Sequence, residues 1–436
     1  MLGYWFSIHN IFYGIRSLRL GCYGVSSKTS SAILGRKNTR LTQLHSCGSY
    51  HIGMSTPLEY LTQLVRRPSV NPMGRTDIPA ELTLEHRVTD YLEEQLKALG
   101  VAYRRTIVAP GRDNLVAHYR APASSETILW EAHQDTVPVD AMVIDPFAAK
   151  VEGGKLYGRG ACDVKAGGAV MLAAFARLVR EQPAGSANVT LAFTVDEEHT
   201  FLGVQQLVKD GVTADFAIIA EPTMWNVVVA HKGVVRWRIE THGRACHSSR
   251  PEQGVNAVYR MAKVLNAVEI YGEAMRNSTA HPTLGTPTFS VGMIGGGVSP
   301  NTVPDRCSIE IDRRLLPGET ADGAIAHLES FLKSRAEIDF AYTVTRNLAC
   351  PPLNPVAGDH PFLCRFETAI DSVVGKHERH SVPYGTDAST IAEAGIPSVV
   401  FGPGDIAQAH TKDEWIEVAQ LEPAAEILFR FACGKA

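Results

Sequence analysis

Two amphipathic helices open the part of the chain where apolar residues recur at a regular spacing. Thr56-Pro57-Leu58-Glu59 has the form of a capping box with proline at the first helical position. Apolar residues then recur with helical spacing at Leu58, Leu61, Leu64 and Val65. A second helical pattern covers about residues 81–99 and ends at Gly100, as a glycine C-cap does. The pattern predicts a folded body that begins close to Met54.

Strands and helices then alternate along the chain. Apolar runs typical of strands lie at 115–118, 127–132, 189–195 and 216–220. Helical patterns lie among them, at 166–181 and 203–210. Such an alternation predicts an α/β sheet, and ligands of such sheets bind at the carboxyl ends of the strands.

The order of elements changes after about residue 231. Alternating or apolar strand patterns lie at 234–242, 288–294, 307–314 and 340–345. Helical patterns lie at 254–271 and 321–335. The resulting order β-α-β-β-α-β is that of a ferredoxin-like unit, and it predicts a second domain inserted in the first.

The strand–helix alternation returns after Pro351-Pro352. Helices are predicted at 361–374, 389–394 and 422–431, with a strand at 398–401. The predicted domains are therefore a catalytic domain in two parts, 54–230 and 347–436, and an inserted domain, 231–346. Residues 1–53 form an N-terminal extension.

Charge separates this extension from the rest of the chain. Residues 1–53 hold six of the 42 basic residues and none of the 46 acidic ones, so the remainder carries a net charge of −10. A basic, serine-rich, acid-free segment is typical of a transit peptide, but it also fits a dispensable extension ahead of a start at Met54. The second interpretation is favoured because a capped helix follows Met54 directly. The acidic body argues against a nucleic-acid surface, which needs a basic stripe.

Cysteines and hydropathy limit the class of protein further. The eight cysteines are scattered without a CxxC pair, which argues against a thiolate zinc site or a disulfide scaffold. Reduced thiols of a cytoplasmic protein are the simpler interpretation. No apolar run is long enough to cross a bilayer, so no membrane partner is expected.

Candidate chemistry begins at the end of the strand 127–132, where His133-Gln134-Asp135 follows. Side chains alternate along a strand, so His133 and Asp135 project to the same side. A metal-binding imidazole is commonly supported by such a carboxylate. A single His-x-Asp is a weak signal, and its meaning depends on partners elsewhere in the chain.

Partners are present at the ends of other predicted strands and turns. They are Asp163, Glu197, Glu198, Glu221 and His410. Each alone fits a solvated loop residue, but two imidazoles with several carboxylates suit zinc and similar divalent ions. Asp163, a short side chain in a glycine-rich turn, is the natural bridge between two ions. A hydrolytic site is indicated, in which one of the adjacent glutamates binds metal and the other serves as base.

At these residues the chain resembles the M20 metallopeptidases, from about Met54 to the C-terminus. The segments that carry the resemblance are His133-Gln134-Asp135, Gly158-Arg159-Gly160-Ala161-Cys162-Asp163, Asp196-Glu197-Glu198, Glu221-Pro222-Thr223 and Ala409-His410. Within the family, the chain is most similar to acetylornithine deacetylases and succinyl-diaminopimelate desuccinylases. The loop Tyr384–Ala388 and the run Gly402–His410 look closest to acetylornithine deacetylases. The resemblance implies an α/β metallohydrolase domain with a mixed sheet, and it makes the inserted ferredoxin-like domain a dimerisation domain.

The resemblance also implies a role for each site residue. One divalent ion, zinc or alternatively cobalt, is expected at His133 and Glu221, and a second at Glu198 and His410. Asp163 bridges the two, Asp135 orients His133, and Glu197 is the general base. A non-proline cis peptide is expected at Asp163-Val164.

Three residues of the inserted domain receive roles in the same way. His247, in Gly243–Ser249, is similar to a family histidine that enters the active site of the partner subunit and stabilises the oxyanion. Asn301 and Arg314 resemble contacts of the substrate carboxylate, which suits a guanidinium, although Arg313 competes with Arg314 for this role. A homodimer is therefore expected.

Three functions are compatible with these features. The first is a metal-dependent amide hydrolase that removes an N-acyl group from an amino acid. The second is a dipeptidase or carboxypeptidase with the same two-metal site, since both reactions cut an amide beside a carboxylate. The third is a metal-binding or ligand-binding protein without catalysis, which the presence of every expected ligand and of Glu197 disfavours.

Overall fold

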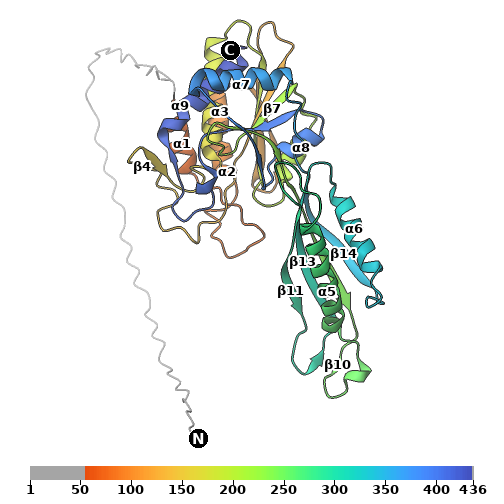
Figure 1. Ribbon diagram of the computed structural model, residues 1–436. Coiled ribbons are helices and arrows are strands. Elements are labelled where there is room, and N and C mark those ends of the chain that lie inside the picture. Colours follow the sequence, from red (N-terminus) through yellow and green to blue (C-terminus); the bar gives the residue numbers. More distant parts are fainter. Residues whose placement is uncertain (1–54, 435–436) are drawn as a thin grey trace, which may run out of the picture. The chain divides into compact units, whose positions relative to one another are not determined.

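The computed structural model describes residues 55–434, so the predicted extension 1–53 lies outside the described residues (Figure 1). Helix α1 (Pro57–Val65) has the predicted capping box at Thr56. Helix α2 (His86–Leu99) ends at Gly100 as predicted, with left-handed φ of 68°. The predicted start of α2 at 81 is wrong. The backbone of Val70 pairs with Leu82 and Leu84, so residues 82–84 are not free to make helical hydrogen bonds.

The larger sheet has eight strands and is mixed, as expected. Its order is β1 (Ala102–Ala109), β2 (Arg112–Tyr119), β6 (Asn188–Thr194), β3 (Thr127–His133), β7 (Phe216–Ile219), β16 (Ser398–Val400), β8 (Val227–His231) and β15 (Arg379–Val382). The central strands β6, β3, β7 and β16 are parallel to one another. β2 runs antiparallel to β1 and β6, and β8 runs antiparallel to β16 but parallel to β15.

Three strands of this sheet are absent from the sequence prediction: β1, β8 and β15. β1 is an edge strand that carries Arg104 and Arg105 and has no fully buried residue, so it lacks an apolar run. β15 is also at an edge and has four residues. β8 follows β7 without an intervening helix, and this breaks the alternation on which the prediction depends.

Helices cover both faces of the sheet. α1, α2, α3 (Lys165–Glu181), α7 (Pro361–Val374) and α9 (Leu421–Ala432) share one core with Ile128 and Trp130 of β3. α4 (Leu202–Lys209) and α8 (Ala388–Glu393) pack on the opposite face with Leu129 of the same strand. Because successive strand residues point to opposite faces, β3 is buried on both sides, which is why it reads as a continuous apolar run.

The inserted segment forms a separate four-stranded antiparallel sheet in the order β11 (Thr288–Gly296), β13 (Arg306–Leu315), β9 (Gly233–His242) and β14 (Tyr342–Cys350). With α5 (Ala257–Arg276) and α6 (Ala321–Lys333) it has the predicted order β-α-β-β-α-β (Figure 1). Its core, which includes Trp237, Met261 and Ile309, is distinct from the cores of the larger sheet. The exact domain limits at 230, 231, 346 and 347 stay predictions.

Several boundaries in the inserted segment differ from the prediction, among them the start of α5 and the end of β14. α5 begins at Ala257 and not at 254, because the side chain of Asn256 caps it by accepting hydrogen bonds from the backbone N–H of Val258 and Tyr259. β14 runs to Cys350 and not to 345, since it pairs with β9 down to Val234. Among residues 55–434, no helix is long and apolar enough to cross a membrane.

A small third sheet brings two distant loops together. β5 (Lys155–Tyr157) pairs with β4 (Lys150–Glu152) and with β17 (Trp415–Glu417). The turn 158–163 follows β5, and the loop with His410 precedes β17. Asp163 and His410 are therefore drawn towards each other although more than half of the chain separates them.

Candidate metal centre

Two groups of potential metal ligands lie at the carboxyl edge of the larger sheet. His133, Glu197 and Glu221 form one group, and Asp163, Glu198 and His410 form the other. In each group the candidate ligand atoms lie within 4.8 Å of one another. β6, β3 and β7 are parallel neighbours, so the residues that follow them meet at one edge. All six residues were expected from the sequence, and the structure brings all six together.

Asp163 lies between the two histidines. Its Oδ1 is 3.3 Å from His133 Nε2, and its Oδ2 is 3.1 Å from His410 Nε2. Glu198 Oε2 lies 3.2 Å from His410 Nε2, and Glu221 Oε1 lies 4.0 Å from His133 Nε2. The two carboxylate oxygens of Asp163 thus face different imidazoles, which is the geometry of a bridging ligand. The expected cis peptide bond is present at Asp163-Val164.

The orientation of His133 leaves its Nε2 available for a ligand. Nδ1 lies 3.0 Å from the backbone carbonyl oxygen of Asp135 and 3.6 Å from Oδ1 of the same residue. These acceptors place the proton on Nδ1. Nε2 is buried, has no hydrogen-bond partner within residues 55–434, and faces Asp163 and Glu221. A buried imidazole lone pair aimed at two carboxylates fits a divalent cation.

Electrostatics in the cluster also favour a cation. Burial, together with neighbouring carboxylates, raises the pKa of Glu197 and of Glu221 well above the usual range. Burial and the nearby Asp163 raise the pKa of Glu198 to about 7. Hydrogen bonds to Asp163 and Glu198 raise the pKa of His410 to about 10. Four acidic groups are crowded together here, so a positive charge would stabilise the site. A divalent ion provides such a charge.

Glu414, which the sequence analysis does not single out, holds the turn that carries Asp163. Its carboxylate accepts hydrogen bonds from the backbone N–H groups of Gly160, Cys162 and Asp163 at 3.1, 2.8 and 3.0 Å. The guanidinium of Arg159 donates to it at 2.7 Å. Nothing in the sequence pairs residues 159–163 with residue 414. Their shared position beside β5 and β17 creates the contact.

Glycines permit the close approach of the loop before His410. A Cβ atom at Gly402 would lie 2.6 Å from the backbone oxygen of Glu221. One at Gly404, where φ is 95°, would lie 2.7 Å from Cys162 Sγ. Larger residues at either position would push the loop away from the turns that carry Glu221 and Asp163.

His247 and Asn301 lie close to each other in the inserted segment. His247 pairs with Thr302 between the short strands β10 (Cys246–His247) and β12 (Thr302–Val303). The backbone N–H of Ser248 donates to the carbonyl oxygen of Asn301 at 3.0 Å. His247 is exposed, and its Nδ1 lies 2.7 Å from Ser249 Oγ. Within one chain, no hydrogen bond or ion pair of the described residues joins His247 or Asn301 to the metal-ligand groups.

Arg314 lies on β13 of the four-stranded sheet, at the end away from β10 and β12. It pairs with Val234, whereas Arg306, eight residues earlier on β13, pairs with His242 near the β10 end. This spacing corresponds to about 26 Å along the strand. Arg313 is buried and donates to Tyr271 Oη at 3.0 Å and to Glu319 at 2.6 Å, so it has a packing role. Arg314 is partly exposed and has one side-chain partner among the described residues, Asp312 at 3.1 Å.

The chain is similar to known proteins over most of its length. The model of peptidase family M20/M25/M40 matches residues 129–433. An acetylornithine deacetylase of Vibrio atlanticus is 30% identical over 352 residues, which cover 78% of this chain and 89% of that protein. An acetylornithine deacetylase of Proteus mirabilis is 29% identical over 392 residues, which cover 87% of this chain and 96% of that protein.

Solved structures share the fold at lower identity. The aminopeptidase PepT of Bacillus cereus superimposes with a TM-score of 0.68 at 23% identity, covering 88% of this chain and 98% of that one. An M20 metallo-carboxypeptidase of Sulfolobus solfataricus gives 0.69 at 19% identity, with 87% and 99% covered. A dinuclear metal-binding M20 peptidase of Bacillus subtilis gives 0.62 at 16% identity, with 86% and 96% covered.

Proposed function

The chain belongs to peptidase family M20/M25/M40 and is a metal-dependent amide hydrolase, and we propose that it removes an N-acyl group from an amino acid. The main support for a metal site is the position of Asp163 between His133 and His410. The acyl-amino-acid substrate is supported by the similarity to acetylornithine deacetylases over most of both chains.

The residues divide into ligands and catalytic groups. His133 and Glu221 would hold one divalent ion, Glu198 and His410 would hold the other, and Asp163 would serve as a ligand to both. Imidazole and carboxylate ligands suit zinc, the preferred ion, and also cobalt, the alternative. Ions bound there supply a Lewis acid for the amide carbonyl and make water more acidic. Asp135 orients His133. Glu197 accepts the proton of the attacking water and delivers it to the leaving nitrogen.

The inserted segment supplies the substrate contacts in this proposal. Arg314 and Asn301 bind the substrate carboxylate, and His247 stabilises the oxyanion. β13 separates Arg306, at the end of the strand that lies near β10, from Arg314 by about 26 Å. A single chain therefore does not place His247 and Asn301, which lie beyond the Arg306 end, in one site with Arg314. The separation supports a homodimer in which the β10 end of one subunit completes the site of the other.

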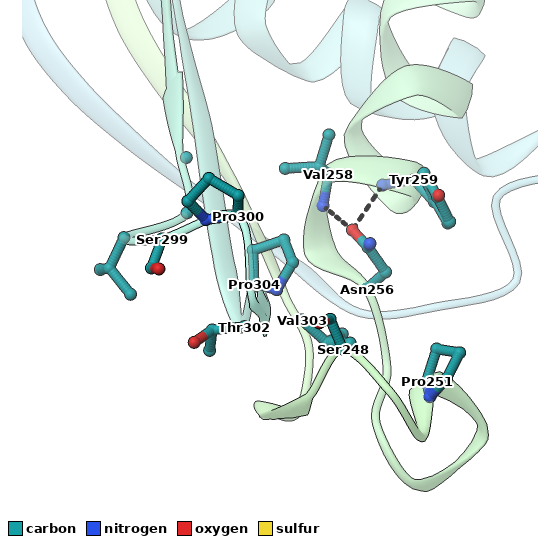
Figure 2. A pocket seen from close by; sticks show the side chains of 13 residues that line it. Ser248, Pro251, Asn256, Val258, Tyr259, Ser299, Pro300, Thr302, Val303 and Pro304 are labelled. Carbon is teal, nitrogen blue, oxygen red and sulfur yellow. Dashed lines mark hydrogen bonds between the residues drawn. The ribbon is translucent and has the colours of Figure 1, made fainter.

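The surface of the inserted segment also supports a homodimer. Tyr259 and Val298 are 72% and 90% exposed, and they line a cavity of about 820 Å³ with Asn256, Pro300 and Pro304 (Figure 2). Met293 and Ile294, 64% and 61% exposed, lie on the neighbouring edge strand β11. Exposed apolar side chains beside an unpaired strand edge are typical of a protein–protein contact.

A substrate panel tests the proposed reaction. The full chain is assayed with zinc or cobalt on N-acetylornithine, N-succinyl-diaminopimelate and dipeptides. We expect N-acyl amino acids to be cleaved fastest, and we expect a chelator to abolish hydrolysis until metal is restored. Preference for dipeptides would favour the peptidase alternative. Full hydrolysis in the presence of the chelator would refute the two-metal site. A cytoplasmic location is part of the proposal, and cell fractionation tests it.

A further inference from the structure

A neutral side chain separates two buried carboxylates behind the ligand groups. Asn71 Nδ2 donates to Asp135 Oδ2 at 2.8 Å and to Asp196 Oδ1 at 2.9 Å. Asn71 and Asp135 are 0% exposed, and Asp196 is 1% exposed. Asp135 follows β3 and Asp196 follows β6, so one amide joins the turns after two neighbouring parallel strands.

The backbone fixes the place of this amide. The N–H of Asn71 donates to Thr136 O at 2.8 Å, and the N–H of Thr136 donates to Ser69 O at 3.1 Å. The side-chain oxygen of Asn71 accepts from the N–H of Met73 at 3.0 Å. With its oxygen engaged by an N–H donor, the amide must present its NH₂ group to the two carboxylates. Both protons of that group are therefore used.

The carboxylate of Asp135 reaches three parts of the site. It accepts from the backbone N–H groups of Glu197 and Glu198 at 3.2 Å each, and Oδ1 lies 3.6 Å from His133 Nδ1. A rotation of this carboxylate would therefore disturb the imidazole of His133 and the turn that carries both glutamates.

Charge around Asn71 shows why a neutral donor is needed there. Arg112 forms ion pairs with Glu85, at 2.9 Å, and with Asp196. Asp196 also accepts from Thr200 Oγ1 and from Asn71. One buried guanidinium thus serves two carboxylates, and Asp135 has no hydrogen bond to it. Without Asn71, Asp135 and Asp196 would face each other across a buried gap with no donor between them, which is unfavourable in a site of low polarity.

We propose that Asn71 is a positioning residue that locks Asp135 to the Asp196 turn and thereby sets the geometry of His133, Glu197 and Glu198 for metal binding. The inference rests on the proposed two-metal site. It assigns to Asn71 no contact with substrate or metal. Supporting residues of this kind typically change metal affinity or activity by 10–100-fold.

The chain offers a matched control in Asn188, which is 8% exposed. Its side-chain amide also both donates and accepts hydrogen bonds. The NH₂ group donates to the carbonyl oxygens of Ser124 and Glu126, and the amide oxygen accepts from the N–H of Ala121. Asn188 begins β6, whereas the ligand-bearing turn follows Thr194 at the other end of that strand. The two asparagines therefore share burial and chemistry, but Asn188 is about 20 Å from the turn.

The experiment measures binding of Zn²⁺ or Co²⁺ by calorimetry, the visible spectrum of bound Co²⁺, and the melting temperature, all on the full chain. We expect Asn71→Leu to weaken metal binding at least about tenfold and to alter the Co²⁺ spectrum. Asn188→Leu lowers the melting temperature but leaves affinity and spectrum as in the unaltered chain. Asn71→Ser, which is smaller and keeps one donor, is the second variant and shows an intermediate loss of affinity.

Three outcomes would contradict the inference, and they distinguish its failure from failure of the proposed function. Unchanged affinity and spectrum in both Asn71 variants would overturn the inference while leaving the two-metal site intact. Equal loss in Asn188→Leu would also overturn it, because the effect would then be general destabilisation. An unaltered chain that binds no divalent ion would refute the proposed function itself, and the inference with it.

Discussion

Glu414 Oε1 accepts a hydrogen bond from the backbone N–H of Asp163 at 3.0 Å, so the residue that faces both imidazoles is held by a carboxylate from the far end of the chain. Glu414 lies four residues after His410, another proposed ligand. The side chain of Glu414 therefore ties the backbone of the turn with Asp163 to the segment that follows His410, and metal affinity should depend on this contact.

Replacing this carboxylate should weaken metal binding. Glu414→Gln would turn an NH₂ group towards backbone N–H donors and leave the buried Arg159 without its ion-pair partner. Breaking a buried ion pair costs about 3–5 kcal/mol of stability. We expect metal affinity to fall by about 10–100-fold, measured by calorimetry. Glu319→Gln is the control, because Glu319 pairs with the buried Arg313 in the inserted segment. It should lower stability and leave metal affinity unchanged; an equal loss of affinity would contradict the prediction.

Glu197 lies close enough to His133 and Glu221 to be either the base or a ligand. As the base, it is needed for turnover but not for metal binding. We expect Glu197→Gln to lower kcat by about 10²–10⁴-fold, while metal analysis still finds two ions per chain. Glu221→Gln serves as the comparison and should lose an ion. Loss of an ion from Glu197→Gln would instead identify Glu197 as a ligand.

The separation of His247 from Arg314 predicts complementation between subunits. His247→Ala and Arg314→Ala should each be nearly inactive alone. In a mixed dimer, one site would combine the intact Arg314 of one chain with the intact His247 of the other. After random reassembly, we expect about a quarter of the unaltered activity to return. Arg236→Ala, which removes another arginine bound to Asp312, is the control and should retain activity. Absence of recovery in verified mixed dimers would argue against a shared site.

His231 predicts a pH dependence of stability. It is fully buried, its Nε2 lies 3.1 Å from Thr386 Oγ1, and burial lowers its pKa to about 4. An unfolded histidine has a pKa of about 6.5, so between these values only the unfolded chain binds the proton. The free energy of unfolding should therefore fall as pH drops from 6.5 towards 4, by about 1.4 kcal/mol per pH unit from this residue.

Denaturant unfolding at several pH values tests the role of His231. His231→Gln keeps hydrogen-bonding groups but does not titrate, so its stability should fall less steeply below pH 6.5. His380→Gln, at an exposed histidine of β15, should retain the slope of the unaltered chain. Identical slopes for His231→Gln and the unaltered chain would show that His231 does not cause the effect.

Local sequence patterns determined much of this protein. The capping box at Thr56, the glycine that ends α2, and the apolar run of β3 depend on short-range hydrogen bonds and on burial of both faces of one strand. The proposed ligands His133, Asp163, Glu198, Glu221 and His410 are recognisable because each follows a strand or turn in an order typical of a known family. The type and order of these residues are enough to predict the ligands without the folded structure.

Tertiary structure alone decided which residues support those ligands. Asn71 meets Asp135 and Asp196, and Glu414 meets the turn 160–163, across 64, 125 and more than 250 residues of sequence. Such contacts leave no periodic trace, because they arise where separate strands end at the same sheet edge. In the His133-Gln134-Asp135 stretch, the sequence predicts a ligand and a supporting carboxylate. Only the folded chain shows that Asn71 donates a hydrogen bond to that carboxylate.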